Sequence, residues 1–272
     1  MTIGPEHGIV PQGMDALRTY TASGIMLRRI DLGEKDRILT AYTRELGKLS
    51  AVAKGSRRPG SKLSGASEPF AYSRMMLAAG RDLDVLTEAE IKESFPHVRA
   101  EIGAVAHAVY FLELVDRFVE DRQPNPDLFD TLLSALYVLE GGTDPELTAR
   151  YFELQVLSIL GYEPQFDSCL RCGKPIGRER VAFSPSLGGV VCRCGVAPND
   201  AIWIPGAAAS YVRALRQVQP NLLRKMRVPP GARRDLDRML KWHIRYRLER
   251  ELKSTEFIQA IEAMESRAFR AC

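Results

Sequence analysis

The sequence contains few of the residues from which catalytic centres are usually built. Four of its 272 residues are histidine, scattered at His7, His97, His107 and His243. Acidic residues are plentiful, yet nothing in their spacing selects a pair for acid–base chemistry. We interpret His107, on an apolar helical stretch, as a packed side chain, and we predict that the protein is not an enzyme.

Long apolar runs are missing as well. No run approaches the ~18 residues of a membrane span, so no membrane contact is expected. Residues 1–12 show no cationic patch followed by an apolar stretch, and are therefore not interpreted as a secretory signal. We expect residues 1–18 to form a loose tail, with Met14 as an alternative start to Met1.

Cysteine is scarce, and its placement is uneven. Five cysteines in a chain of this length do not make a disulfide scaffold, and in a reducing cytosol close pairs favour metal binding. Four of them lie within 26 residues, as Cys169-x2-Cys172 and Cys192-x-Cys194, whereas Cys272 is interpreted as a bystander. Two close pairs of thiolates suit one tetrahedral zinc ion.

This zinc site is predicted to be structural, because protein would fill all four positions around the ion. The 19-residue gap between the pairs fits a small ribbon whose hairpin turns at Gly188-Gly189. The Cys-x-Cys pair leaves less room than Cys-x2-Cys for amides to donate to sulfur, so weaker binding is expected. The alternative is four buried or adventitious thiols that bind no metal.

The net charge of +4 hides a strongly divided chain. Residues 44–81 carry eight Lys or Arg against two acids, residues 91–167 carry five against fourteen, and residues 211–253 carry thirteen against four. Such a division indicates a basic surface for a polyanion and an acidic body that faces elsewhere. Ordinary solvated surface charge is the alternative for any single cluster.

The first basic region falls within a β-rich segment. About five short β-like runs occupy residues 20–90, and the short turn at Gly47 predicts a hairpin, so a small closed barrel is expected. A Gly-, Pro- and Ser-containing loop carries Lys54, Arg57, Arg58 and Lys62. We predict a DNA-binding surface that consists of this loop and its possible neighbours, Arg28, Arg29, Lys48 and Arg74.

The rest of the chain is predicted to be mainly helical, with Asn125-Pro126-Asp127 capping one helix and Thr143-Asp144-Pro145-Glu146 opening the next. In the last long helix, an apolar stripe lies beside a basic ridge, which is a possible second DNA contact and consists of Arg234, Arg238, Lys241 and Arg245. Trp242 and Tyr246 lie outside the stripe. Either they stack on bases or, as is more common, they complete a core.

These patterns predict an α+β protein with a modular chain. The expected parts are a tail at 1–18, a barrel at 19–90, a helical domain at 91–164 and 201–272, and an inserted zinc-ribbon-like module at 165–200.

Several short segments follow one another in a specific order. They are Gly33–Leu39, Thr43–Leu49, Ala53–Arg58 with Ser61, Glu68–Phe70, Tyr110 with Glu113-Leu114, Phe152–Leu154, Leu160–Pro164, and Cys169-x2-Cys172-Gly173 with Phe183-Ser184 and Gly188-Gly189. In this order and spacing, from about Tyr20 to the C-terminal helices, the chain resembles the RecO family of bacterial recombination mediators.

The resemblance implies an N-terminal OB-fold, a helical domain and an inserted zinc module. It also implies binding of single- and double-stranded DNA, annealing of complementary strands, and work with RecR and the single-strand-binding protein to load RecA. A cytoplasmic protein at the nucleoid is expected. The DNA-binding basic residues of the family map onto Lys54, Arg57, Arg58 and Lys62. Some members lack the zinc cysteines.

Two other functions are compatible with the sequence. One is a zinc-ribbon factor that reads a defined nucleic-acid sequence, and the other is a metal-dependent nucleic-acid enzyme. The second is disfavoured because no ligand set with an open position is visible.

Overall fold

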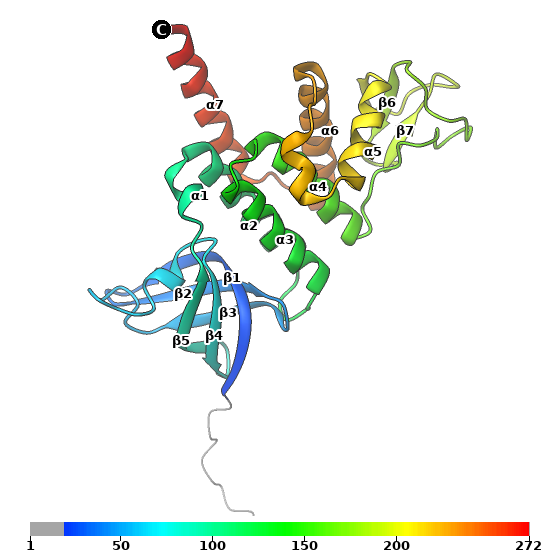
Figure 1. Cartoon of the computed structure of the whole chain (residues 1–272). Helices are drawn as coiled ribbons and strands as arrows, with labels where there is room; N and C mark the ends of the chain where they lie inside the picture. Colours follow the sequence, from blue (N-terminus) through cyan, green and yellow to red (C-terminus); the bar gives the residue numbers. More distant parts are fainter. Residues whose placement is uncertain (1–18, 272) are drawn as a thin grey trace, which may run out of the picture.

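The computed structural model describes residues 19–271 (Figure 1). The expected tail at 1–18, the alternative start at Met14 and the fifth cysteine, Cys272, lie outside the described residues. No helix in the described part of the chain is both long and apolar enough to cross a membrane.

A closed five-stranded barrel forms the N-terminal part, at the bottom of Figure 1, as predicted. Its strands are paired in the order β1-β2-β3-β5-β4. They are β1 (Thr19–Leu32), β2 (Asp36–Thr43), β3 (Gly47–Ala53), β4 (Tyr72–Ala78) and β5 (Asp84–Glu93). Alternate residues of β3 point inward, so that Leu49 packs with Met26 and Leu86 inside the barrel.

Helices form the rest of the molecule, with a small sheet at its upper right in Figure 1. The helices are α1 (Pro96–Ala100), α2 (Ile102–Phe118), α3 (Pro126–Glu140), α4 (Pro145–Ile159), α5 (Ala207–Gln217), α6 (Pro230–Leu248) and α7 (Lys253–Ala271). Two short 3-10 helices are η1 (Gly65–Ser67) and η2 (Pro220–Lys225). Asn125 and Asp144 cap α3 and α4 by accepting hydrogen bonds from Leu128 N and Leu147 N, as predicted.

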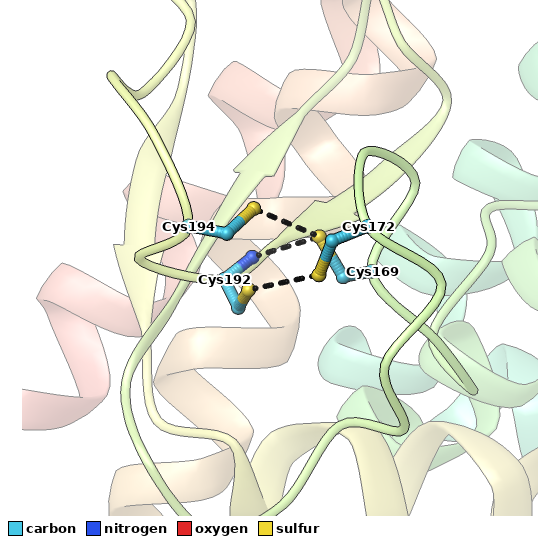
Figure 2. A group of neighbouring side chains, drawn as sticks. All are labelled: Cys169, Cys172, Cys192 and Cys194. Carbon is cyan, nitrogen blue, oxygen red and sulfur yellow. Dashed lines mark hydrogen bonds between the residues drawn. The ribbon is translucent and has the colours of Figure 1, made fainter.

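The four clustered cysteines lie beside the small sheet, in what we call the cysteine module (residues 165–200) (Figure 2). The sheet has the order β7-β6-β8 and consists of β6 (Val181–Ser184), β7 (Gly189–Val191) and β8 (Ile202–Ile204). Its two faces serve different cores. Phe183 belongs to the large core of the helices, whereas Ala182 and Val191 pack with Cys169 on the other face.

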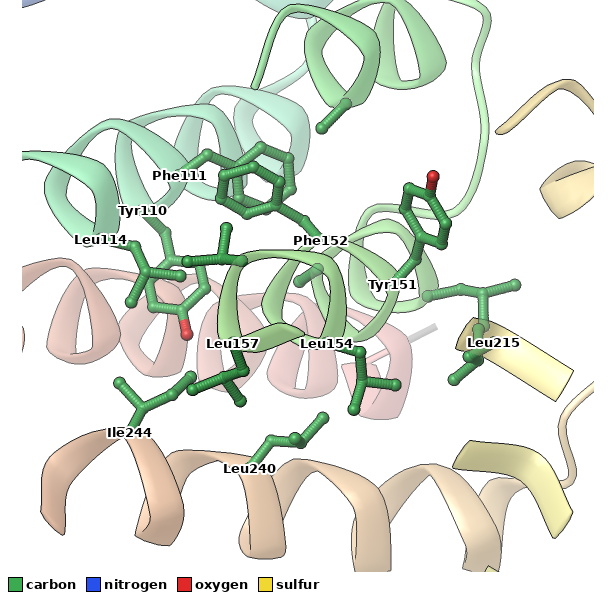
Figure 3. Packing of buried hydrophobic residues seen from close by; sticks show 14 of the residues in the cluster. Tyr110, Phe111, Leu114, Tyr151, Phe152, Leu154, Leu157, Leu215, Leu240 and Ile244 are labelled. Carbon is green, nitrogen blue, oxygen red and sulfur yellow. The ribbon is translucent and has the colours of Figure 1, made fainter. Parts of the chain in front are cut away.

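Helix α4 lies at the centre of the helical core, where Phe152, Leu154 and Leu157 are fully buried (Figure 3). One face of this helix also carries a buried ionic cluster. Arg150 pairs with Glu153 at 2.8 Å and with Asp237 of α6 at 2.5 Å. The Tyr110 hydroxyl of α2 donates to Glu153 at 2.5 Å. Three helices are therefore joined by polar contacts through the middle of an apolar core.

Ion pairs also join the barrel to the helices. Lys48 of β3 pairs with Asp116 of α2 at 3.4 Å and donates to its carbonyl oxygen at 2.9 Å. Arg28 contacts the same carboxylate at 3.2 Å, and Arg44 makes two 3.0 Å contacts with Asp130 of α3. The acidic charge predicted for the helical body is thus partly neutralised by the barrel.

The backbone of the barrel lies against the chain after α2 at Gly47, which has φ +71°. A Cβ atom at this position would overlap the backbone of Gln123. Gly33 has a similar φ of +60° but has open space around it. The two glycines therefore separate the cost of a left-handed backbone from the cost of a backbone clash.

We predict that Gly47→Ala destabilises the protein by about 3 kcal/mol or more, and that Gly33→Ala costs about 1 kcal/mol. The left-handed conformation alone costs ~1–2 kcal/mol in a residue with a Cβ, and forced overpacking adds ~1–3 kcal/mol. Urea unfolding followed by circular dichroism gives both free energies of unfolding. Equal losses in the two variants would contradict the close approach at Gln123.

Candidate metal centre and nucleic-acid interface

The four cysteines predicted to bind zinc lie together. Every pair of their sulfur atoms lies within 4.8 Å, with 3.8 Å between Cys169 and Cys194 and 3.5 Å between Cys172 and Cys192. A tetrahedral zinc ion with bonds of ~2.3 Å separates its sulfur ligands by about 3.8 Å. The thiols of Cys169, Cys172, Cys192 and Cys194 therefore lie close enough together to surround one zinc ion.

Backbone amides donate to Cys169 from both halves of the cluster. The amides of Arg171 and Cys192 lie 3.4 and 3.3 Å from its sulfur, and Figure 2 draws the contact from Cys192. Burial raises the pKa of Cys169, but hydrogen bonds from the amides of Cys192, Cys172 and Arg171 outweigh it and lower the pKa to about 6. The shorter Cys-x-Cys turn thus still supplies one amide, that of Cys192. This amide donates to the sulfur of Cys169, which belongs to the Cys-x2-Cys pair.

The Cys194 thiol has the opposite tendency. Its hydrogen bond to Cys192 and the neighbouring sulfurs raise its pKa to about 12. Four sulfurs at this spacing cannot all carry negative charge without a cation among them, because like charges a few ångströms apart oppose each other's ionisation. A bound zinc ion supplies that charge and would hold all four as thiolates.

The predicted basic loop folds back onto the turn between β1 and β2. Its backbone is fixed there by Arg57 N, which donates to Lys35 O at 3.0 Å, and by Gly55 N, which donates to Asp36 Oδ1 at 2.7 Å. The Arg57 side chain donates to Gly33 O at 2.7 Å and pairs with Asp31 at 3.5 Å. The Arg57 side chain therefore holds the loop against the β1–β2 turn through these two contacts.

The other three cations of the loop have a different environment. Lys54, Arg58 and Lys62 are exposed, and none of them lies within ion-pairing distance of a carboxylate in residues 19–271. Lys35 is equally exposed and, through the contacts of Arg57, lies beside them. We call Lys35, Lys54, Arg58 and Lys62 the loop cations.

Lys35 was missed by the sequence analysis. The register of the β2–β3 hairpin could have revealed its position. In this register, Arg37 of β2 lies opposite Ala53 of β3. This register places the residues just before β2 beside those just after β3. A lysine in the first turn therefore falls next to the basic loop.

The remaining predicted barrel cations are not gathered at the loop. Arg28 and Lys48 are paired with Asp116, and only 14% of the Lys48 side chain is exposed. Arg29 pairs with Glu68. Arg74 is exposed on β4, where its register neighbour on β5 is Glu90. DNA binding by these four residues stays a prediction. Each of them already has an acidic neighbour within the protein.

The four basic residues of the predicted ridge lie on α6. Three of them have a carboxylate within ion-pairing distance. Lys241 contacts Asp237 at 3.0 Å, Arg245 contacts Glu251 at 2.7 Å, and Arg238 lies 3.6 Å from Asp235. Arg234 is exposed and has no carboxylate within ion-pairing distance in the described part of the chain. Arg238, Lys241 and Arg245 also line a cavity of about 760 Å³ between α6 and α7.

The two aromatic residues beside the ridge differ in their contacts. Trp242 is half-buried, and its Nε1 donates to the carbonyl oxygen of Asp200 at 2.9 Å. It therefore attaches α6 to the cysteine module. Tyr246 remains 43% exposed.

Two histidines of the helical part, His107 and His243, are packed rather than poised for chemistry. His107 is buried with Nδ1 2.8 Å from Gly103 O, and burial lowers its pKa to about 4. His243 is fully buried with Nε2 2.8 Å from Tyr162 O, and burial likewise lowers its pKa to about 4. Both rings are thus neutral at physiological pH, in agreement with the interpretation of His107 as a packed side chain.

We predict that protein purified under reducing conditions without chelator contains one zinc per chain, and that Cys169→Ala loses it. Elemental analysis by mass spectrometry measures the zinc content. The matched control is Cys272→Ser, which removes one thiol outside the cluster and is expected to keep the full zinc content. Absence of zinc from the unaltered protein would show that the thiols do not form a metal site.

Comparison with known proteins extends over nearly the whole chain. Residues 14–95 match the family model described as Recombination protein O N terminal, and residues 99–256 match Recombination protein O C terminal. A protein named DNA repair protein RecO from Desulforamulus reducens is 32% identical, with 90% of this chain and 96% of the relative covered. Those from Pelotomaculum thermopropionicum and Heliobacterium modesticaldum are each 37% identical, with 89% and 90% of this chain and 94% and 91% of the relatives covered. The chain therefore belongs to the RecO family of DNA repair proteins.

Proposed function

We propose that this protein is a DNA repair and recombination mediator. In this proposal it binds single- and double-stranded DNA, anneals complementary strands, and helps to load RecA onto strands coated by the single-strand-binding protein. The observation that carries the proposal is the set of loop cations, four exposed positive charges without carboxylate partners in residues 19–271 at one site on a closed barrel. Small barrels with such a surface commonly bind single strands.

The proposed mechanism of binding is electrostatic. Each loop cation that approaches a phosphate releases a condensed counterion, which favours binding at low salt and weakens it as salt rises. Neutralised strands repel each other less, so complementary bases can approach and pair. This mechanism needs no activated water and no nucleophile, in agreement with a protein that is not an enzyme.

The proposed role of zinc is structural. If Cys169, Cys172, Cys192 and Cys194 hold the ion, no position remains open for a substrate or a water molecule. The metal would then stabilise the cysteine module by an amount on the order of 10 kcal/mol and take no part in a reaction.

Protein partners are proposed to bind the helical part rather than the barrel loop. The acidic segment 91–167 would repel DNA, and its helices carry exposed apolar side chains such as Ile102 and Tyr137. RecR and the single-strand-binding protein are the partners expected there, and RecA would be reached indirectly. The proposed place of action is the cytoplasm, at the nucleoid.

We predict that the triple variant Lys54→Glu, Arg58→Glu, Lys62→Glu loses strand annealing at moderate salt. It should also bind a labelled oligonucleotide more weakly, and the slope of log affinity against log salt should fall by about 2, because about 0.7 counterions are released per phosphate of a single strand. Arg57 is left unchanged because it fixes the loop to Gly33. Fluorescence polarisation and an annealing assay measure the two effects.

The matched control for this variant reverses three exposed cations outside the loop, Arg81 between β4 and β5 and Arg224 and Lys225 of η2. It carries the same change in net charge but leaves the loop cations unaltered. We expect it to keep most of the affinity and the annealing. Unchanged annealing in the loop variant would refute the assignment, and equal losses in both variants would show that only net charge matters.

A further inference from the structure

We propose that a second segment of a DNA strand binds where the cysteine module meets α6, on three arginines gathered around Trp203. The proposal rests on the proposed DNA-binding function and adds to it a site that depends on the metal. The three arginines are Arg180, Arg193 and Arg238, and we call them with Trp203 the junction site.

Three different segments supply these side chains. The guanidinium carbon of Arg193 lies 5.5 Å from the centroid of the Trp203 ring. Arg180, just before β6, donates to the carbonyl oxygen of Trp203 at 3.3 Å, and Arg238 of α6 donates to the same oxygen at 3.0 Å. Because the positions are far apart in sequence, their meeting around one tryptophan is a product of the fold.

The positive charge at the junction site is poorly balanced. Neither Arg180 nor Arg193 lies within ion-pairing distance of a carboxylate in the described residues. Arg238 has one acidic neighbour, Asp235 at 3.6 Å, and 56% of its side chain is exposed. The carboxylate of Asp200 pairs with none of the three arginines in the described residues, and it accepts hydrogen bonds from Ser184 Oγ and Ser186 N.

A DNA strand fits this arrangement better than an acidic peptide does. Guanidinium groups bind phosphates through paired hydrogen bonds, and both arginine and tryptophan present flat faces on which a base can stack. Each nucleotide of a strand carries both a phosphate and a base. A strand can therefore use both the charge and the flat faces of the site. A peptide of acidic residues would use only the charge.

The cysteine cluster determines the position of one of these arginines. Arg193 lies between Cys192 and Cys194, so the metal that binds both sulfurs would also hold the Arg193 backbone. Trp242 fixes the other side, because its Nε1 donates to Asp200 O. A structural metal would thereby support a binding surface that it does not itself touch.

The junction site and the loop cations are well separated. In Figure 1 the barrel lies at the bottom, the module lies at the upper right, and the helices stand between them. Two segments of DNA can therefore be held at the same time by one chain.

Tryptophan emission offers a direct test, because the chain has two tryptophans and both lie at this junction, whereas the barrel has none. An oligo-dT strand is titrated into the full-length zinc-loaded protein, with its binding followed by polarisation of a label and by tryptophan emission. We expect emission to change on binding. The variant Arg180→Glu, Arg193→Glu should lose this change and lower the salt slope by about 1.4.

Four controls separate the junction site from the loop cations and from misfolding. The variant Lys174→Glu, Arg178→Glu carries the same charge change on the same module and should keep the emission change. The loop triple variant should bind more weakly yet reach the same emission change at saturation. Zinc content shows that each variant has kept its metal, and Arg180→Gln, Arg193→Gln repeats the test without charge reversal.

The outcomes distinguish this proposal from the proposed function. If labelled DNA does not bind at all, the proposed function fails. If it binds while the emission stays constant and the Arg180 and Arg193 variants bind normally, the junction site alone is overturned. A polyglutamate peptide that changes the emission as strongly as the oligonucleotide would assign the site to acidic proteins and would also overturn it.

Discussion

The buried guanidinium of Arg150 is the constraint on which the helical part depends. A charge in that position is tolerated only because it pairs with the buried Glu153 and with Asp237, whose side chain is partly exposed. Each partner belongs to a further contact, since Glu153 also accepts from Tyr110 and Asp237 also pairs with Lys241. The cluster therefore fixes the rotation of α6 relative to α4. That rotation sets which residues of α6 face the cysteine module.

Pairing within the molecule divides its many cations into two groups. Those that face the helices, such as Lys48 and Arg44, find carboxylates at the boundary of the barrel and hold the two parts together. Lys54, Arg58 and Lys62 in the loop after β3 find none in the described residues and remain available to a polyanion. The basic barrel and the acidic helices are thus complementary to each other before any DNA is bound.

The sequence predicted the architecture well because its signals are local. The caps at Asn125 and Asp144, the turn at Gly47 and the close cysteine pairs each depend on a few neighbouring residues. It could not rank the basic residues, because whether a cation is free depends on which acid the fold brings to it. Lys48 is predicted to contact DNA from its neighbours in sequence, and only the fold shows that it also pairs with Asp116.

The strand β6 lies between the hydrophobic core of the helices and the cysteine cluster. Val181 and Phe183 face the core of the helices, and Ala182 between them faces the cysteine cluster. Because side chains alternate along a strand, inserting or deleting one residue within β6 would exchange the two faces and place Phe183 against the sulfurs. A change in length between Lys174 and Arg180, which is mostly exposed, would leave that alternation intact. Homologous chains should therefore vary in length in this segment, while β6 itself keeps its length.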